Sequence, residues 1–152
     1  MNERLHLEQQ AVRTMLGWRT VAVVGLSAKA GRPSLDVAAY LQRHGYRIVP
    51  VNPAFAGQAI LGEPCHATLA DAAQALAATG GRIDWVDIFR KAEDVPPVVA
   101  EAIAIGARGV WLQLGIVNDE AVEAALAAGL LAVQDHCSKI EHMRLSAAGA
   151  LA

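Results

Sequence analysis

The sequence has few aromatic residues, few cysteines and little net charge, and each shortage excludes a class of protein. Aromatic residues make up 5% of the chain while 54% of it is hydrophobic, so the core must consist mainly of Ala, Val, Leu and Ile. Two cysteines are too few for a disulfide framework, which favours a reducing, cytoplasmic compartment. A net charge of -2 leaves no broad cationic surface, so we expect no nucleic-acid partner.

Long apolar runs are also missing. Residues 1–17 mix charged and apolar side chains, so they lack the continuous apolar stretch of a secretion signal. No later run reaches membrane-spanning length, and we expect no membrane partner. The apolar residues of 1–17 recur at roughly helical spacing before Gly17, which predicts an amphipathic helix that packs on the rest of the domain.

Short apolar runs alternate with helical patterns along the remaining chain. Val21–Val24 is an unbroken apolar run followed by glycine, as expected for a parallel strand covered on both faces. Pro33, Ser34, Thr68 and Asn118 are suited to helix starts. We predict an α/β fold, one Rossmann-like domain over residues 1–152, with a doubly wound, parallel five-stranded sheet and helices on both faces. The remaining strands are expected near 47–51, 83–89, 109–112 and 130–133, and the helices near 33–44, 69–78, 95–105 and 119–128.

The turn after the first strand is the first candidate for a ligand site. Sheets of this kind bind ligands beyond the carboxyl ends of their strands, where the strand order reverses. Backbone N–H groups of residues 25–32 and the following helix N-terminus can bind one anion. Ser27 and Ala30 replace two glycines of a dinucleotide fingerprint, so the glycine pattern alone is not diagnostic. Lys29 and Arg32 favour a ligand with several phosphates, with solvated loop charges as the alternative.

The ends of the other strands narrow the choice of ligand. Val51-Asn52-Pro53 lacks the acidic residue that binds ribose in NAD domains, and it also lacks a basic residue for NADP. A phosphorylated ribose could still be bound by the loop cations. Phe89-Arg90 is suited to an adenine face and a phosphate, although Phe89 is equally compatible with the core. Gln113 lies beside the flexible Gly115 and is a further candidate contact.

Together these segments resemble the small bacterial CoA-binding-domain family, which is similar in turn to the N-terminal CoA-binding domain of the succinyl-CoA synthetase alpha subunit. The likeness lies in Val24-Gly25-Leu26-Ser27, Arg32-Pro33-Ser34, Val51-Asn52-Pro53, Asp87-Ile88-Phe89-Arg90, Trp111-Leu112-Gln113-Leu114-Gly115 and Lys139-Ile140-Glu141-His142.

The resemblance implies that the chain binds coenzyme A or an acyl-CoA as its ligand. It implies that the first turn holds the pyrophosphate, that Lys29 and Arg32 pair with phosphates, and that residues 51–53 with Phe89 and Arg90 flank the adenosine. The predicted contacts are Gly25, Leu26, Ser27, Ala28, Lys29, Arg32, Pro33, Ser34, Val51, Asn52, Pro53, Phe55, Ile88, Phe89, Arg90, Gln113, Gly115 and Ile116.

Catalysis by this chain alone is not expected. The synthetase carries its phosphorylated histidine in a second domain, and we expect none here, since the sequence ends at Ala152. Asp135, His136, Cys137, Glu141 and His142 form a dense cluster, but their spacing yields neither a triad nor a metal-binding face. We interpret Cys137 as a buried structural thiol. The sequence departs from the family here, because Asp135-His136-Cys137 stands where the family has D-R-C.

Two other functions stay open. A small NAD(P)-dependent oxidoreductase would need a general acid, and no Tyr-Lys pair or substrate domain is visible. A regulatory or interaction module with a vestigial nucleotide site would have its strand-end cations paired with its own carboxylates. A homodimer or a partner subunit is compatible with the apolar N-terminal helix and with Trp18, Trp85 and Trp111, which we otherwise interpret as packing residues.

Overall fold

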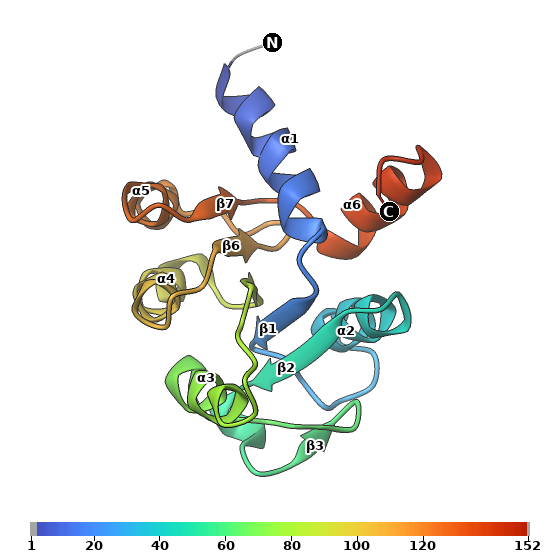
Figure 1. Ribbon diagram of the computed structural model, residues 1–152, viewed down its shortest axis with the longest axis vertical. Coiled ribbons are helices and arrows are strands. Elements are labelled where there is room, and N and C mark those ends of the chain that lie inside the picture. Colours follow the sequence, from blue (N-terminus) through green and yellow to red (C-terminus); the bar gives the residue numbers. More distant parts are fainter. Residues whose placement is uncertain (1–2, 152) are drawn as a thin grey trace.

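A computed structural model describes residues 3–151 of the chain. Within them a five-stranded parallel sheet runs in the order β2-β1-β5-β6-β7 (Figure 1). The chain passes from β1 outward to β2 and then returns to β5 on the other side of β1, so the strand order reverses between β1 and β5. The predicted Rossmann-like sheet is confirmed. Its strands are β1 (Thr20–Val24), β2 (Arg47–Val51), β5 (Trp85–Ile88), β6 (Gly109–Leu112) and β7 (Leu131–Val133).

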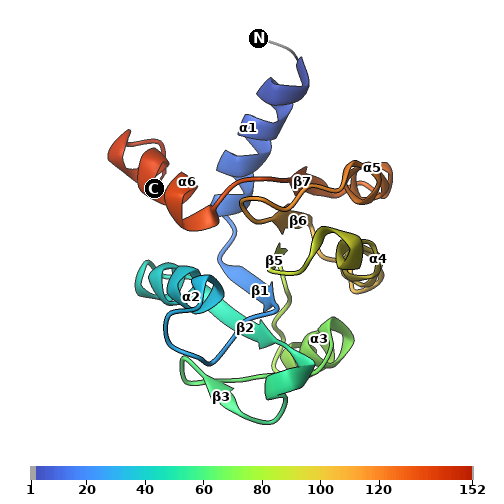
Figure 2. The same cartoon turned by 180° about the vertical axis from the view of Figure 1, so that it is seen from behind.

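Helices cover both faces of this sheet, as Figure 1 and the reverse view in Figure 2 show. Alternate strand residues point to opposite faces, which divides the apolar core into two layers. Val21 and Val23 pack in one layer and Ala22 and Val24 in the other. The first layer involves α1 (Glu3–Leu16), α2 (Pro33–Arg43) and α6 (Ser138–Ala147), and the second involves α3 (Leu69–Ala77), α4 (Val95–Ala104) and α5 (Asp119–Ala127).

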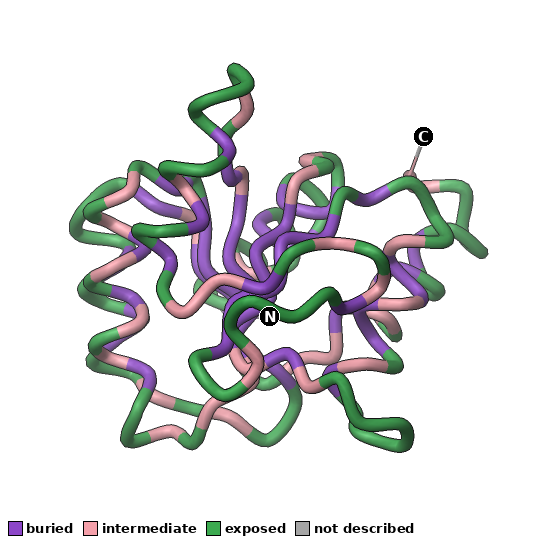
Figure 3. Tube along the Cα trace, turned by 90° about the horizontal axis from the view of Figure 1, so that it is seen from below, coloured by how far each residue is buried: buried purple, intermediate pink, exposed green. Residues whose placement is uncertain are grey.

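Buried residues follow the strands and the inward sides of the helices (Figure 3). Trp85 and Trp111 are fully buried on one face of the sheet, with ring centroids 5.4 Å apart. Their indole N–H groups donate to the carbonyl oxygens of Trp18 and His136, each at 2.9 Å, so neither burial leaves a polar group unpaired. The interpretation of these two tryptophans as packing residues is confirmed. No helix within residues 3–151 is long and apolar enough to cross a membrane.

The helix starts agree with the sequence at three positions, Pro33, Thr68 and Asn118, and differ at one. The side chain of Thr68 accepts from the Asp71 N–H at 3.1 Å, and that of Asn118 accepts from the Ala121 N–H at 3.0 Å, so both are N-caps as predicted. Ser34 is not a cap: α2 begins at Pro33, with Arg32 as an N-cap that makes no side-chain hydrogen bond.

A small hairpin between β2 and α3 was not predicted. It pairs β3 (Ala59–Ile60) with β4 (Glu63–Pro64). Leu61 and Gly62 form its turn with positive φ values of 54° and 78°. Two-residue strands are too short to show an alternating pattern, which explains the omission. Two short 3-10 helices follow β2 and β5, η1 (Pro53–Phe55) and η2 (Ala92–Asp94).

Candidate functional site

A cavity of about 750 Å³ lies beyond the carboxyl ends of β1, β2, β5 and β6, at the point where the strand order reverses. Its volume is in the range of small-molecule sites. The cavity is lined by many of the predicted contacts, namely Gly25, Ser27, Lys29, Arg32, Pro33, Ser34, Asn52, Phe55, Phe89, Arg90, Gln113 and Ile116. The switch-point rule therefore located a real cavity from the sequence.

The other predicted contacts lie outside the cavity lining. Leu26, Val51 and Ile88 are buried in the core, and Ala28, Pro53 and Gly115 are neighbours of lining residues. Ligand contact by these residues stays a prediction. The lining also includes residues that were not among the predicted contacts, namely Val37, Ala54, Lys91, Leu114, Cys137 and Ile140.

The glycine turn is held against the end of β5. Gly25 has φ of +87°, and a Cβ on it would lie 2.2 Å from the carbonyl oxygen of Phe89, so only glycine fits. The Ser34 hydroxyl accepts from the Ser27 N–H, and the Ser27 hydroxyl accepts from the Lys29 N–H, each at 3.0 Å. Ser34 thus fixes the turn where it was expected to cap the helix. These bonds give the turn a defined shape at the N-terminus of α2.

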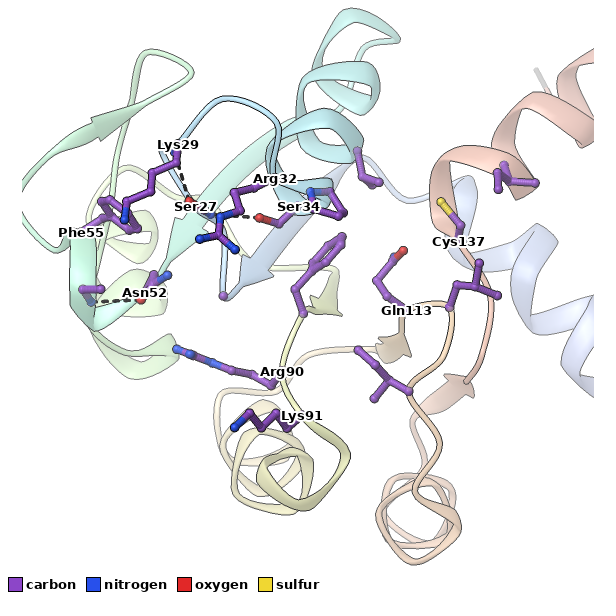
Figure 4. Close-up of a pocket in the computed structure, with 18 residues that line it drawn as sticks. Ser27, Lys29, Arg32, Ser34, Asn52, Phe55, Arg90, Lys91, Gln113 and Cys137 are labelled. Carbon is purple, nitrogen blue, oxygen red and sulfur yellow. Dashed lines mark hydrogen bonds between the residues drawn. The ribbon is translucent and has the colours of Figure 1, made fainter.

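Four cations surround one end of the cavity. Figure 4 shows Lys29 and Arg32 on the glycine turn and Arg90 and Lys91 on the loop after β5. None of the four forms an ion pair within residues 3–151, whereas Lys139 of α6 is paired with Asp36 at 2.9 Å. A cation near a helix N-terminus is repelled by the positive end of the helix dipole. An anion bound there would be attracted both by the cations and by that end of the dipole. A vestigial site would have these cations paired with carboxylates, and they are not.

Asn52 stands at the end of β2, where an NAD domain carries its acidic residue. Its side-chain amide donates to the Leu26 carbonyl at 3.1 Å and accepts from the Ala54 N–H at 3.0 Å. The thiol of Cys65, which is buried, donates to the Asn52 carbonyl at 3.5 Å. Asn52 therefore ties the glycine turn to the loop that carries Phe55.

A buried polar network lies below the other end of the cavity. The side-chain N–H₂ of Gln113 donates to Asp87 and, at 2.9 Å, to the Ser138 hydroxyl. That hydroxyl donates to the other Asp87 oxygen at 2.8 Å. Burial raises the pKa of Asp87 to about 7, although the hydrogen bonds that Asp87 accepts from Gln113 and Ser138 act to lower it. The network links β5, β6 and α6. Asp87 is an acidic residue inside an otherwise apolar run of the sequence, and this signal could have indicated the network, but no network was predicted from it.

One polar atom of the Gln113 side chain makes no hydrogen bond within residues 3–151. Both hydrogens of its amide are engaged, and its Oε1 has no hydrogen-bond partner among the described residues. The side chain is only 4% exposed, yet it lines the cavity. Oε1 is therefore available to accept a hydrogen bond from a bound molecule.

The cluster of polar residues after β7 divides into separate roles. Asp135 accepts from the Gly115 N–H at 2.8 Å, and His136 contacts Glu8 of α1 at 3.1 Å. His142 is buried against the hydroxyl of Tyr40 at 2.7 Å. Across residues 3–151, no three His, Cys, Asp or Glu side chains are grouped so that they could hold a metal ion. The interpretation of Cys137 as a buried thiol is wrong, because it is half-buried and lines the cavity.

Known proteins resemble this chain over most of its length. Residues 19–143 match the family model described as the CoA binding domain. An uncharacterized protein of Bacillus subtilis, YneT, is 36% identical over 124 residues, which are 82% of this chain and 85% of that protein. A Thermus thermophilus structure, "cell-free ID.343", is 35% identical with a TM-score of 0.80, and the match covers 95% of this chain and 99% of the other.

More distant structures share the fold alone. A Rex-family repressor, also solved in complex with beta-NADH, is 15% identical with a TM-score of 0.55, over 97% of this chain. The match covers 67% of the repressor chain, or 68% in the NADH complex. The family model, by contrast, spans most of this chain, and the Bacillus subtilis and Thermus thermophilus proteins are each more than 30% identical to this chain. This chain belongs to the CoA-binding domain family.

Proposed function

We propose that the cavity binds coenzyme A or an acyl-CoA, without catalysis by this chain alone. The observation that carries the proposal is the uneven polarity of the cavity. Lys29, Arg32, Arg90 and Lys91, which form no ion pair within residues 3–151, lie at one end, while the uncharged Gln113 and Cys137 lie at the other. The lining also includes the apolar side chains of Leu114, Ile116 and Ile140. Coenzyme A has the same asymmetry, because its phosphates are on the adenosine end and its pantetheine arm is uncharged.

The parts of the ligand can be assigned to parts of the cavity. The diphosphate lies against the glycine turn and the N-terminus of α2, where N–H groups and two cations favour an anion. The adenosine lies between the end of β2 and Phe89, within reach of Arg90. Predicted contacts outside the lining, such as Val51, would take part through their backbone. The pantetheine arm then extends toward Gln113.

NAD or NADP is the competing ligand. The structural likeness to an NADH-binding repressor supports a nucleotide in this fold, but at 15% identity it does not select the nucleotide. Asn52 uses its side chain to hold the glycine turn, so the ribose contact typical of NAD domains is missing. Dinucleotides are therefore the comparison ligands in the test of the proposal.

The test is calorimetric titration in reducing buffer with CoA, dephospho-CoA, NADH and NADPH. We expect CoA to bind more tightly than the other three. Lys29→Ala and Arg32→Ala should each weaken CoA binding at least about tenfold, because a hydrogen bond to a charged group contributes ~1.5–3 kcal/mol. The matched control is Arg82→Ala, because Arg82 is an exposed cation that pairs with Asp84 at the opposite ends of the strands. Binding of NADPH without binding of CoA would refute the proposal.

A further inference from the structure

Cys137 places a free thiol at the neutral end of the cavity. It is the N-cap residue of α6, but its side chain makes no capping hydrogen bond. The thiol is unpaired with any other cysteine, half-buried and part of the cavity lining. In Figure 4 its sulfur points toward the middle of the cavity, on the side away from the cations. A thiol in this position can contact a ligand directly.

Gln113 independently indicates what kind of ligand binds beside this thiol. Its side chain is nine-tenths buried, its N–H₂ is held by Asp87 and Ser138, and its Oε1 is left open on the cavity. Figure 4 shows that oxygen pointing into the same space as the Cys137 sulfur. A fixed acceptor selects a ligand with an N–H or O–H donor. The pantetheine arm carries amide N–H groups along its length and ends in a thiol.

The direction of the arm follows from the cations. If the phosphates occupy the end with Lys29 and Arg32, the arm must extend across the cavity to Gln113 and beyond it to Cys137. We propose that Cys137 is a covalent attachment site for coenzyme A, forming a disulfide with the thiol at the end of the pantetheine arm. This inference rests on the proposed function, because it uses the same cavity and the same ligand orientation.

The attachment is a thiol–disulfide exchange with the disulfide of coenzyme A as co-reactant. The Cys137 thiol loses its proton, and the sulfur attacks one sulfur of the CoA disulfide. A bond forms between Cys137 and that sulfur while the original S–S bond breaks. The second CoA leaves as a thiolate and takes up the proton. The disulfide is consumed as the oxidant, one CoA is released as a thiol, and a reducing thiol reverses the reaction.

The inference separates free from acylated coenzyme. An acyl-CoA has its sulfur in a thioester and offers no thiol or disulfide, so it would occupy the cavity without forming this bond. The other cysteine provides an internal comparison. Cys65 is 3% exposed and donates to the Asn52 carbonyl, and burial raises the pKa of its thiol, so it is not expected to react.

The experiment is intact-mass spectrometry of the full chain incubated with CoA disulfide in the absence of reductant. We expect one CoA adduct per chain, mapped to Cys137 and removed by dithiothreitol. Cys137→Ser should lose the adduct while unfolding at a similar temperature, and Cys65→Ala should keep it. Adduct formation should be at least tenfold faster with CoA disulfide than with glutathione disulfide, and prior addition of acetyl-CoA should slow it.

Failure of this inference differs from failure of the proposed function. Reversible CoA binding in reducing buffer, combined with no adduct or with an adduct on Cys65, would overturn the covalent attachment and leave the binding site intact. Equal rates with CoA disulfide and glutathione disulfide would also overturn it, because the thiol would then be reactive without recognition of the coenzyme. The absence of CoA binding in any buffer would overturn both.

Discussion

Gly25 is the residue at which β1 and β5 approach each other at the mouth of the cavity. Its φ is +87°, and an added Cβ would lie 2.2 Å from the Phe89 carbonyl oxygen, which belongs to backbone and cannot rotate away. A left-handed conformation costs a side-chain-bearing residue ~1–2 kcal/mol, and overpacking costs a further ~1–3 kcal/mol. Gly25→Ala is therefore expected to lower the free energy of unfolding by about 2–5 kcal/mol in a urea titration.

Gly31 provides the matched control for this prediction. Its φ is +86°, almost the same as that of Gly25, but a Cβ added to it would meet no atom within 4 Å. Gly31→Ala retains the backbone cost without the clash, so a loss of only about 1–2 kcal/mol is expected. Equal losses in the two variants would contradict the argument that the close approach to Phe89 selects glycine at position 25.

Single residues also mark the limit of sequence reasoning. Gly25 was predicted as a turn because it follows an apolar run, and the structure agrees. Ser34 was expected to cap a helix and Cys137 to be buried. A serine hydroxyl can accept from any N–H group within hydrogen-bonding distance. The path of the turn places the Ser27 N–H next to the Ser34 hydroxyl, which accepts from it. The exposure of Cys137 depends on how α6 packs against α1 and α2, which no local pattern encodes.

Elements were easier to predict than their boundaries. The runs at β1, β2 and β6 were placed at nearly their observed bounds, because each is apolar and ends at a turn former. The strand expected at 83–89 is shorter, Trp85–Ile88, because the pairing with β1 and β6 covers only these residues. Asn118 and Thr68 indicated where their helices begin, because their side chains are of the type that caps helix N-termini. The β3–β4 hairpin has no such signal.

The network of Asp87 joins β5, β6 and α6, and its stability should depend on pH. Burial raises the pKa of Asp87 to about 7 from an ordinary value of 3.8. The folded state therefore keeps a proton that the unfolded state releases between these values. The stabilisation is complete below the unfolded pKa and is lost as pH rises through the folded pKa, by about 1.4 kcal/mol per pH unit in between.

Asp87→Asn isolates this effect because asparagine does not titrate. We expect the unfolding free energy of the natural chain to fall relative to that of Asp87→Asn as pH rises from about 4 to about 7. Denaturant unfolding at several pH values measures the difference. Asp71→Asn is the control for the same chemical substitution at an exposed site. Parallel curves for the natural chain and Asp87→Asn would contradict the raised pKa.

At the scale of the whole molecule, the cavity combines segments that are far apart in the chain. Its walls come from the glycine turn, the loop after β2, the loops after β5 and β6, and the start of α6. The first four lie at carboxyl ends of parallel strands, so the topology rule predicted their meeting. The start of α6 follows the edge strand β7, and its reach to the cavity is a result of tertiary packing. Cys137 and Ile140 were missed for that reason.

The whole molecule has a net charge of -2, so its overall field does not attract an anionic ligand, and local cations must do so. Raising the salt concentration from about 0.1 M to about 1 M shortens the Debye length from ~10 Å to ~3 Å, which weakens attraction between exposed charges. We therefore expect the affinity for CoA to fall about tenfold over this range, equivalent to ~1.4 kcal/mol. Pantetheine lacks the phosphates, and its weaker binding at the Gln113 end should change little in the same titrations. A salt dependence shared by both ligands, or absent for CoA, would show that Lys29, Arg32, Arg90 and Lys91 do not hold the phosphates.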